Sequence, residues 1–412
     1  MLLEFAVRNF RSFKELQVFS LEASKEPSKN DGVQRIIEKD GYRAAKTKAI
    51  YGANASGKTN LISGLVSMWK IMDKNLNYKD TLRTYVNPYR LDSKLHDEPC
   101  YFQIIFLHEG LRYRYGFEVD KEKVHSEWLY VKKKKEVVYF KRVGKEMVEL
   151  NETNFKEGKV IRQGIKMFTE KTLVVPVLDQ WDSPTSTIVK ESINRKIAIS
   201  LNLSSDEWNH WFRATMHYFE RDDLFKRWTT KLLKEIDGSI KGSETHELER
   251  LDGEIEKIPI IIRQSDDGDT PFILQREEAS GTKKMFDYSS VIYHSLIQGQ
   301  TLIIDEMDSM LHPKLTRKII DLFQSPDAHP EAQLIFVTHD TNLMDSELLR
   351  RDQITFVEKV DEGYSEIFDL SDIKGVRAKD LFEKNYLKGN YGALPTLNRM
   401  EKALLDKELV NA

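Results

Sequence analysis

The chain opens with alternating apolar and polar positions, which predict a strand over residues 2–8 and another over residues 16–21. The same alternation returns between residues 99 and 150 and predicts an antiparallel meander. A hairpin turn is expected at residues 108–110. The expected strands of the meander cover residues 101–108, 111–119, 124–131 and 137–142. The pattern therefore predicts an antiparallel β subdomain.

Other, shorter runs are apolar throughout and predict buried strands. Residues 47–51 form one such run, and the apolar positions of residues 60–74 behind it follow one face of a helix. Residues 301–304 and 333–337 form two more runs, each followed by polar side chains. Because ligands gather at the carboxyl ends of strands in parallel α/β sheets, these polar residues are candidates for chemistry. Further strands are expected near residues 354–358 and 365–370.

A helical pattern fills much of the middle of the chain. Residues 186–236 place aromatic and aliphatic side chains at intervals of three and four, which predicts helices. An aromatic stripe with this spacing suits a core or a partner surface, and a platform for stacking bases is the alternative. No heptad persists over several repeats, so a long coiled coil is excluded. Strands are expected again at residues 257–263 and 272–275.

Charge narrows the kinds of partner. The 63 basic and 66 acidic residues nearly cancel to a net charge of −3, so any contact with DNA must be a local patch. Residues 132–135, four lysines at an expected turn, form one such patch. A solvated hairpin end is the simpler interpretation of these lysines. The composition, 40% hydrophobic and 31% charged, is typical of a globular protein with a large core.

Cysteine usage and the apolar runs indicate the compartment. Cys100 is the only cysteine, which excludes an internal disulfide and a zinc site built on cysteine pairs. No run of about 18 uncharged apolar residues occurs, so we expect no contact with a membrane. The first residues carry an acid, Arg8 and Arg11, which argues against a signal peptide. We expect a cytoplasmic protein.

Residues 52–59, GANASGKT, carry the first clear chemistry. They match the phosphate-loop pattern G-x-x-x-x-G-K-[ST] and lie between a predicted strand and a predicted helix, as that motif requires. Backbone N–H groups of such a loop turn toward phosphate oxygens. Lys58 then reaches the β- and γ-phosphates, and Thr59 is placed to bind Mg²⁺. The sequence predicts a nucleoside triphosphate site here.

A second group of residues suits the other side of such a site. Ser280 and Gly281 stand at the expected start of a helix, where free N–H groups and a hydroxyl can hold an anion. Asp305 and Glu306 end a buried strand, which suits a Mg²⁺ ligand followed by a general base beside the attacking water. His339 ends the next strand, from which it can touch the γ-phosphate or position the water.

The order of these motifs resembles the ABC-type ATPase heads of the RecF, SMC and OLD group. In that resemblance Ser280 and Gly281 correspond to the signature motif, the acids at 305 and 306 to the Walker B pair, and His339 to the switch histidine. Residues 9–13 are similar to the N-terminal strand and turn of the group. Residues 350–395 resemble the bacterial RloA/AbiLi family of abortive-infection ATPases.

The resemblance implies an α/β P-loop NTPase fold. This would be an ABC-type ATPase head with a mixed sheet, an antiparallel β subdomain and an inserted helical arm. Four regions are expected: ATPase lobe I at 1–180 with the meander at 99–150, a helical insertion at 181–255, ATPase lobe II at 256–395, and a C-terminal tail at 396–412.

ATP and Mg²⁺ are the cofactors that the resemblance implies. The residues expected to contact the nucleotide are Gly52, Asn54, Ser56, Gly57, Lys58, Thr59, Asn60, Ser280, Gly281, Thr282 and Arg11. The expected metal ligands are Thr59, Asp305 and Gln180, the last as a Q-loop glutamine for which Gln163 is a competitor. The expected catalytic residues are Glu306, His339 and Lys58.

The resemblance also implies how the protein works. Ser280 and Gly281 would contact the nucleotide that Lys58 of another subunit holds, which makes a head-to-head homodimer or a higher homo-oligomer. The implied role is an ATP-hydrolysing switch in anti-phage defence that controls a separately encoded effector, a Toprim-like or other nuclease. A RecF-like DNA-binding clamp in repair is the alternative. The signature lacks the leucine of transporter-type subunits, which argues against that third class.

Overall fold

The computed structural model describes residues 1–26, 32–74, 80–164, 169–194, 196–200, 205–249, 253, 255–266, 268–360 and 363–395. The side chains of 162–164, 200 and 205–209 lie outside this description, as does the expected tail at 396–412. Within these described ranges, no helix is long and apolar enough to cross a membrane.

A seven-stranded antiparallel sheet contains the expected meander. Its strand order is β10-β9-β8-β7-β6-β1-β2, with every neighbouring pair antiparallel. The strands are β1 (Leu2–Arg8), β2 (Gln17–Ser20), β6 (Cys100–His108), β7 (Leu111–Val119), β8 (Val124–Lys132), β9 (Glu136–Val143) and β10 (Glu146–Leu150). The period-two pattern thus predicted four meander strands to within two residues, and β10 is an addition with no fully buried side chain. A separate hairpin joins β3 (Ile36–Lys39) and β4 (Tyr42–Ala45).

A six-stranded mixed sheet carries the phosphate loop. The strand order is β11-β15-β16-β5-β17-β18, parallel except for β18, which runs antiparallel to β17. The strands are β5 (Thr47–Tyr51), β11 (Ile197–Ser200), β15 (Thr301–Ile304), β16 (Gln333–Val337), β17 (Ile354–Lys359) and β18 (Ser365–Asp369). Because β5, β15 and β16 are parallel neighbours, the residues that follow them meet at one edge of the sheet. The expected mixed sheet is confirmed.

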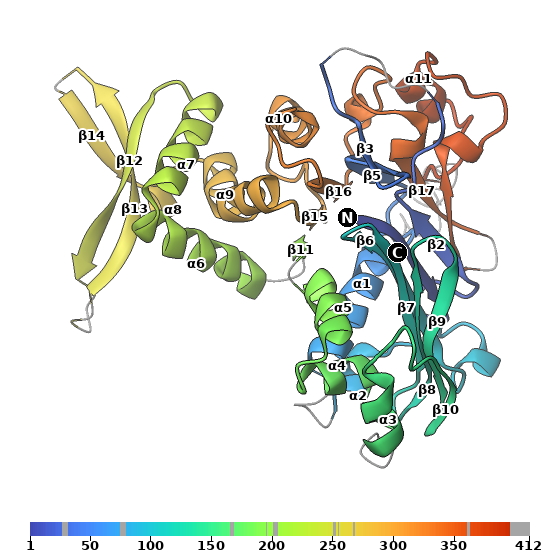
Figure 1. Cartoon of the computed structure of the whole chain (residues 1–412). Coiled ribbons are helices and arrows are strands. Elements are labelled where there is room, and N and C mark those ends of the chain that lie inside the picture. Colours follow the sequence, from blue (N-terminus) through green and yellow to red (C-terminus); the bar gives the residue numbers. More distant parts are fainter. Residues whose placement is uncertain are drawn as a thin grey trace, which may run out of the picture.

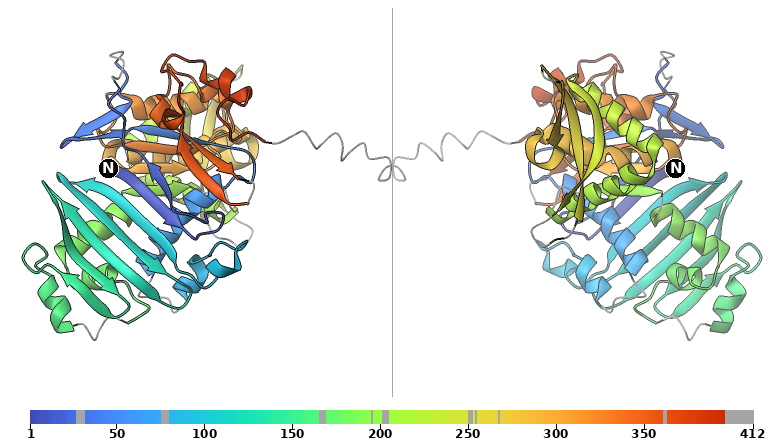
Figure 2. Two further views of the ribbon diagram at one scale, coloured as in Figure 1. Left: turned by 90° about the vertical axis from the view of Figure 1, so that its right-hand side faces the viewer. Right: turned by 90° about the vertical axis from the view of Figure 1, so that its left-hand side faces the viewer.

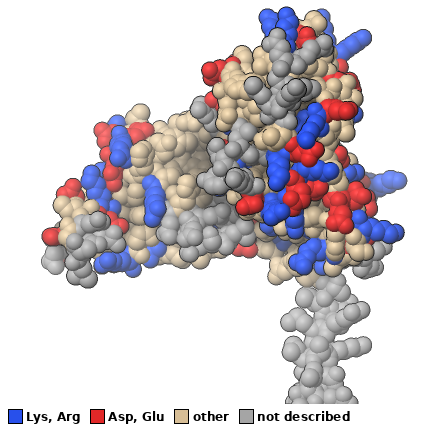
Figure 3. Space-filling model, turned by 90° about the horizontal axis from the view of Figure 1, so that it is seen from below, with Lys and Arg blue, Asp and Glu red and all other residues tan. Residues whose placement is uncertain are grey.

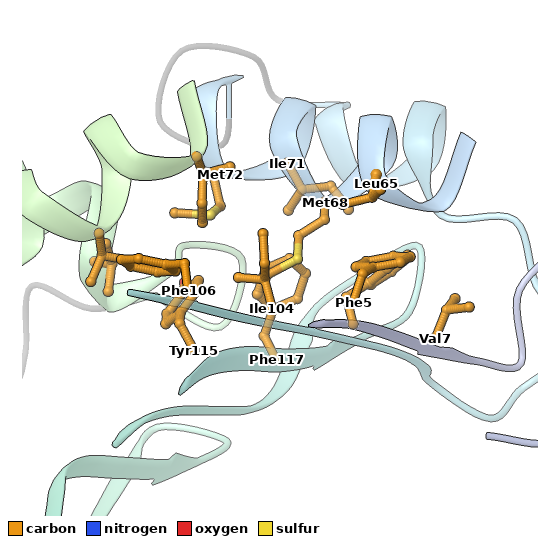
Figure 4. Close-up of a cluster of buried hydrophobic side chains, with 14 of the residues drawn as sticks. Phe5, Val7, Leu65, Met68, Ile71, Met72, Ile104, Phe106, Tyr115 and Phe117 are labelled. Carbon is orange, nitrogen blue, oxygen red and sulfur yellow. The ribbon is translucent and has the colours of Figure 1, made fainter. Parts of the chain in front are cut away.

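Helix α1 (Lys58–Lys74) begins at the end of the phosphate loop and packs its apolar face on the antiparallel sheet (Figure 4). The facing side chains are Leu65, Met68, Ile71 and Met72 from the helix, and Phe5, Val7, Ile104, Phe106, Tyr115 and Phe117 from the sheet. Burying each such side chain contributes on the order of 2 kcal/mol. This packing holds the helix N-terminus, and therefore the phosphate loop, in a defined place.

Smaller helices surround these sheets. They are α2 (Thr81–Tyr85), η1 (Ser93–Leu95), α3 (Gly158–Gly164), α4 (Val174–Asp179), α5 (Pro184–Asn194), α10 (Pro313–Gln324), η3 (Thr341–Leu343), η4 (Arg351–Gln353), η5 (Leu370–Asp372) and α11 (Phe382–Leu387). In the side views of Figure 2, the antiparallel sheet and the part with α10 and α11 lie at opposite ends of the molecule.

A further part projects to the left in Figure 1. It consists of α6 (Ser205–Arg221), α7 (Asp223–Ile236), β12 (Ile240–Glu249), β13 (Ile255–Ser265), β14 (Gly268–Ile273), α8 (Leu274–Glu277) and α9 (Ser280–Gln298). Strands β12, β13 and β14 form an antiparallel sheet. Part of the aromatic stripe packs on α9: Phe212 and Phe219 contact Phe286, and Phe225 and Trp228 contact Tyr293.

The prediction of helices over residues 186–236 is confirmed for α5, α6 and α7 but is wrong at residues 197–200, and the insertion expected to be helical also contains β12. Residues 197–200 form β11, which pairs with β15 and so belongs to the mixed sheet, and β12 is a long strand. The run at 197–200 is only four residues long, too short for its pattern to separate strand from helix. Most side chains of β12 are at least partly exposed, so its alternation is weak. The boundaries at 181 and 255 stay a prediction.

A cleft of about 940 Å³ lies between this projecting part and the rest of the molecule. It is lined by residues of α1, α5, β11, α6 and α9, among them Trp69, Trp211 and Tyr218. Figure 3 shows the underside: charged side chains gather on the right-hand part and at the left-hand end, and the described residues between them are mostly uncharged.

Candidate nucleotide site

The phosphate loop joins β5 to α1 and requires glycine at two positions. Gly52 has φ 153° and Gly57 has φ 114°. A Cβ at position 57 would overlap the hydroxyls of Ser365 and Ser12, and one at position 52 would overlap the carbonyl of Val357. The glycines therefore let the loop pass close to its neighbours, as an anion-binding loop does.

Lys58 lies inside this loop. Its Nζ donates to the carbonyls of Gly52 and Ala53, each at 2.9 Å. Burial lowers the pKa of Lys58, and the charges of Asp305 and Glu306 oppose that shift. The ammonium therefore lies in the field of both acids and beside the loop that would hold phosphate.

Thr59 and Asp305 are the residues that would bind a magnesium ion. The side chains of Thr59 and Asp305 lie beside each other. Oδ1 of Asp305 is buried and has no hydrogen-bond partner among the described residues. Burial raises the pKa of Asp305, while the Thr59 hydroxyl acts in the other direction. A hydroxyl and a buried carboxylate oxygen with spare capacity are ligands that Mg²⁺ accepts beside nucleotide phosphates, so these residues fit that ion.

Glu306 and His339 follow β15 and β16 at the same edge of the sheet. Glu306 is exposed and has φ 49°, an uncommon value for a residue other than glycine. The backbone N–H of His339 donates to a carboxylate oxygen of Asp308 at 3.3 Å. Burial lowers the pKa of His339, and the charge of Lys58 lowers it further, which favours the neutral imidazole. The expected catalytic groups are thus brought within electrostatic reach of one another.

The signature residues lie on a different element. Ser280 is the first residue of α9 and is exposed, as expected for a helix start, whereas Thr282 is buried. A Cβ on Gly281 would come within 3.1 Å of the carbonyl of Met310, in the loop behind Glu306. No hydrogen bond among the described residues joins Ser280 or Gly281 to the phosphate loop of the same chain.

The N-terminal turn packs against the start of α1. Arg11 donates to Ser63 Oγ at 2.9 Å and to Asn60 Oδ1 at 3.4 Å, and Asn60 donates to Ser12 Oγ at 2.9 Å. Arg11 and Asn60 are therefore close to the phosphate loop. Within the loop, Asn54 is exposed, while the buried Ser56 hydroxyl has no partner among the described residues and could bind phosphate.

The structure gives Gln180 no link to this site. It is exposed at the C-terminal end of α4, where its neighbour Asp179 accepts hydrogen bonds from Thr187 and Lys190 of α5. No hydrogen bond of the described residues joins Gln180 to Thr59 or Asp305. Its role as a metal ligand stays a prediction, and the side chain of its competitor Gln163 lies outside the described residues.

Two residues near the site received no role of their own from the sequence. Lys284 donates to the carbonyls of Ser309 and Glu306, and Asp308 accepts from the backbone of His339. Lys284 stands within the helical run behind the signature residues. Thr282, Lys283 and Asp287 are its polar neighbours in the sequence, so no local pattern marks Lys284 as a buried charge.

One protein-family model matches most of the chain. A family model described as "AAA domain, putative AbiEii toxin, Type IV TA system" matches residues 49–142 and 176–345. These ranges include the phosphate loop, the signature residues, Asp305, Glu306 and His339. No curated protein matches the chain in sequence.

Several solved structures are similar in fold. The SMC head domain from Thermotoga maritima has 15% identity and a TM-score of 0.42, over 89% of this chain and 98% of that one. An SmcHead bound to the C-winged helix domain of ScpA has 13% identity and a TM-score of 0.46, over 89% and 97%. The third is an Smc head domain with an extended coiled coil, bound to the C-terminal domain of ScpA derived from Pyrococcus furiosus. It has 11% identity and a TM-score of 0.41, over 89% of this chain and 96% of that one.

Proposed function

The chain belongs to the AAA-domain family described as a putative AbiEii toxin of a type IV toxin–antitoxin system, and from this premise we propose that it hydrolyses ATP as a molecular switch. One observation carries the proposal. The hydroxyl of Thr59 lies beside the buried carboxylate of Asp305, and the charge of Lys58 acts on the same carboxylate. One oxygen of Asp305 has no hydrogen-bond partner among the described residues. This is the set of groups that a nucleotide with Mg²⁺ requires.

Each group has a role in hydrolysis. The loop N–H groups and Lys58 hold the phosphates, and Thr59 with Asp305 would hold Mg²⁺. When bound, that ion neutralises charge on the phosphates. Glu306, exposed at the sheet edge, orients the attacking water and accepts its proton. His339 follows β16 at the same edge of the sheet, and its lowered pKa favours the neutral imidazole, which would hydrogen-bond the γ-phosphate or the water.

The site is completed by a second copy of the chain. Support comes from Ser280, which is exposed at the start of α9 and, among the described residues, makes no hydrogen bond to the phosphate loop of its own chain. In the proposed dimer Ser280 and Gly281 contact the ATP that Lys58 of the other copy holds. ATP binding then closes the dimer and hydrolysis opens it.

The family description and the resemblance of the motifs support a proposal for the biological role. We infer a defence function in which the cycle controls a separately encoded effector, a Toprim-like or other nuclease. The resemblance of residues 350–395 to the RloA/AbiLi abortive-infection ATPases supports the same role. A RecF-like DNA clamp would instead bind DNA in an ATP-stimulated and strongly salt-dependent manner.

The substitution Glu306→Gln tests the proposal. We expect ATP to bind with unchanged affinity, while turnover falls by at least about 100-fold because the base is lost and the ligands stay. The closed dimer should accumulate with ATP, measured by analytical ultracentrifugation. Glu146→Gln, an exposed site in β10, is the matched control and should hydrolyse normally. Unchanged turnover in Glu306→Gln would contradict the assignment.

A further inference from the structure

Lys284 places a positive charge against the loop between β15 and α10, which carries Glu306. It lies in α9, one turn after Ser280, and only 1% of the residue is exposed. Its Nζ donates to the carbonyl of Ser309 at 2.6 Å and to the carbonyl of Glu306 at 3.3 Å. One ammonium therefore joins the signature helix to two carbonyls of the loop that carries the general base.

Burying this ammonium has a cost. Removing a lysine charge from water is unfavourable, and here burial lowers the pKa of Lys284 to about 8, against the opposing charges of Asp308 and Glu306. A methionine of similar length would fill the same space without that cost. What the lysine adds is a pair of charged hydrogen bonds to backbone carbonyls, each stronger than a neutral one.

The loop that receives these hydrogen bonds has an unusual backbone. Glu306 has φ 49° and Met310 has φ 63°, both in the left-handed region. Such conformations cost on the order of 1–2 kcal/mol per residue and persist only where neighbouring groups hold them. The loop is also tied to β16, because the N–H of Met307 donates to the carbonyl of Val337 at 3.0 Å. The Glu306 carbonyl, and with it the direction of its side chain, is held from the side of α9 by Lys284.

We propose that Lys284 is a positioning residue that holds Glu306 in its hydrolytic orientation and links that orientation to the contact which Ser280 makes with the nucleotide of a second copy. The inference rests on the proposed function. Since Ser280 and Lys284 lie on the same face of one helix, a displacement of the helix start moves the ammonium with it. The contact of Ser280 with the nucleotide is thereby linked to the position of Glu306 through the two hydrogen bonds of Lys284.

The substitution Lys284→Met separates this role from nucleotide binding. We expect kcat for ATP to fall by about 10- to 100-fold, as a misplaced catalytic group does, while the Kd of ATP changes by less than about threefold. Lys283→Met, one position earlier on the same helix, is the matched control and should keep its kcat. Lys284→Arg retains a charged donor and should recover part of the loss. An equal loss of ATP affinity in Lys284→Met, or wild-type kcat, would overturn the proposal.

A double variant shows whether Lys284 acts through Glu306. In the Glu306→Gln background, Lys284→Met should lower the remaining turnover by less than about twofold, because the group it positions is already absent. A further full loss would mean that Lys284 acts elsewhere and would overturn the proposal. Thermal unfolding of each variant checks the fold; if Lys284→Met unfolds, the same comparison uses Lys284→Arg. Failure of the proposed function is distinct, because it appears as normal turnover in Glu306→Gln alone.

Discussion

Single residues around the site differ in how far the sequence reveals them. Lys58, Thr59, Asp305 and Glu306 could be predicted because each belongs to a short motif whose spacing is set by local backbone geometry. Lys284 could not, because its partners lie more than 20 residues away and meet it only when α9 packs beside β15. Long-range contacts of this kind leave no local pattern.

The buried Asp287 of α9 should make the stability of the protein depend on pH. It is 1% exposed, its Oδ2 has no partner among the described residues, and burial raises its pKa to about 8. In the unfolded chain an aspartate has a pKa of about 3.9. Between these two values the unfolded state has lost a proton that the folded state keeps, so stability falls as pH rises from about 4 to about 8.

The variant Asp287→Asn removes this pH-dependent term. We expect the free energy of unfolding to rise by on the order of 2 kcal/mol at pH 8 and by less at pH 5. Urea unfolding at both pH values measures the difference. Asp223→Asn on the neighbouring α7, where the carboxylate is exposed, is the control. A gain that is larger at pH 5 than at pH 8 would refute the assignment.

At the scale of elements, the hydrophobic period of a segment and its length decided whether it could be predicted from the sequence. The long strands β6 to β9 were found from the alternation in their sequences, although β6 is buried on both faces over most of its length. Strand β11 was missed because its four residues cannot be assigned by periodicity, and its place beside β15 is set by tertiary packing. The position of α9 against α6 and α7 was also beyond the pattern, although the aromatic stripe indicated a core.

One guanidinium joins three elements next to the signature motif. Arg263 of β13 binds both oxygens of the buried Glu278, at 3.0 and 2.7 Å, and Asp237 at the end of α7, at 2.7 Å. Glu278 stands two residues before Ser280. The start of α9 is thereby tied to the three-stranded sheet by a bidentate charged contact.

The variant Arg263→Met should loosen this connection. It leaves Glu278 buried without its partner, which costs about 3 kcal/mol in the free energy of unfolding. ATP-dependent dimerisation should weaken because Ser280 loses its fixed position, while ATP binding to a single chain is retained. Sedimentation with and without ATP measures this, with Arg227→Met on the exposed side of α7 as control. Dimerisation equal to the wild type would show that the contact does not position the signature.

At the scale of the whole molecule, the arrangement of the two half-sites predicts the behaviour of mixed variants. A chain with Lys58→Ala cannot hold phosphate, and a chain with Ser280→Arg cannot complete the site of its partner. Each homodimer then has two defective sites, and both variants should be inactive alone. A mixed dimer combines the intact Lys58 of one chain with the intact Ser280 of the other, which restores one of its two sites.

Mixing the two variants in equal amounts should therefore restore hydrolysis. Half of the dimers are then mixed and each has one intact site, so about a quarter of wild-type turnover is expected if the sites act independently. Lys58→Ala mixed with Thr59→Ala is the decisive control, because both changes lie on the same half-site and a mixed dimer still lacks an intact one. Recovery in the first mixture but not in the second requires that Ser280 acts across the interface. No recovery at any mixing ratio would contradict the shared site and leave each chain to close its own.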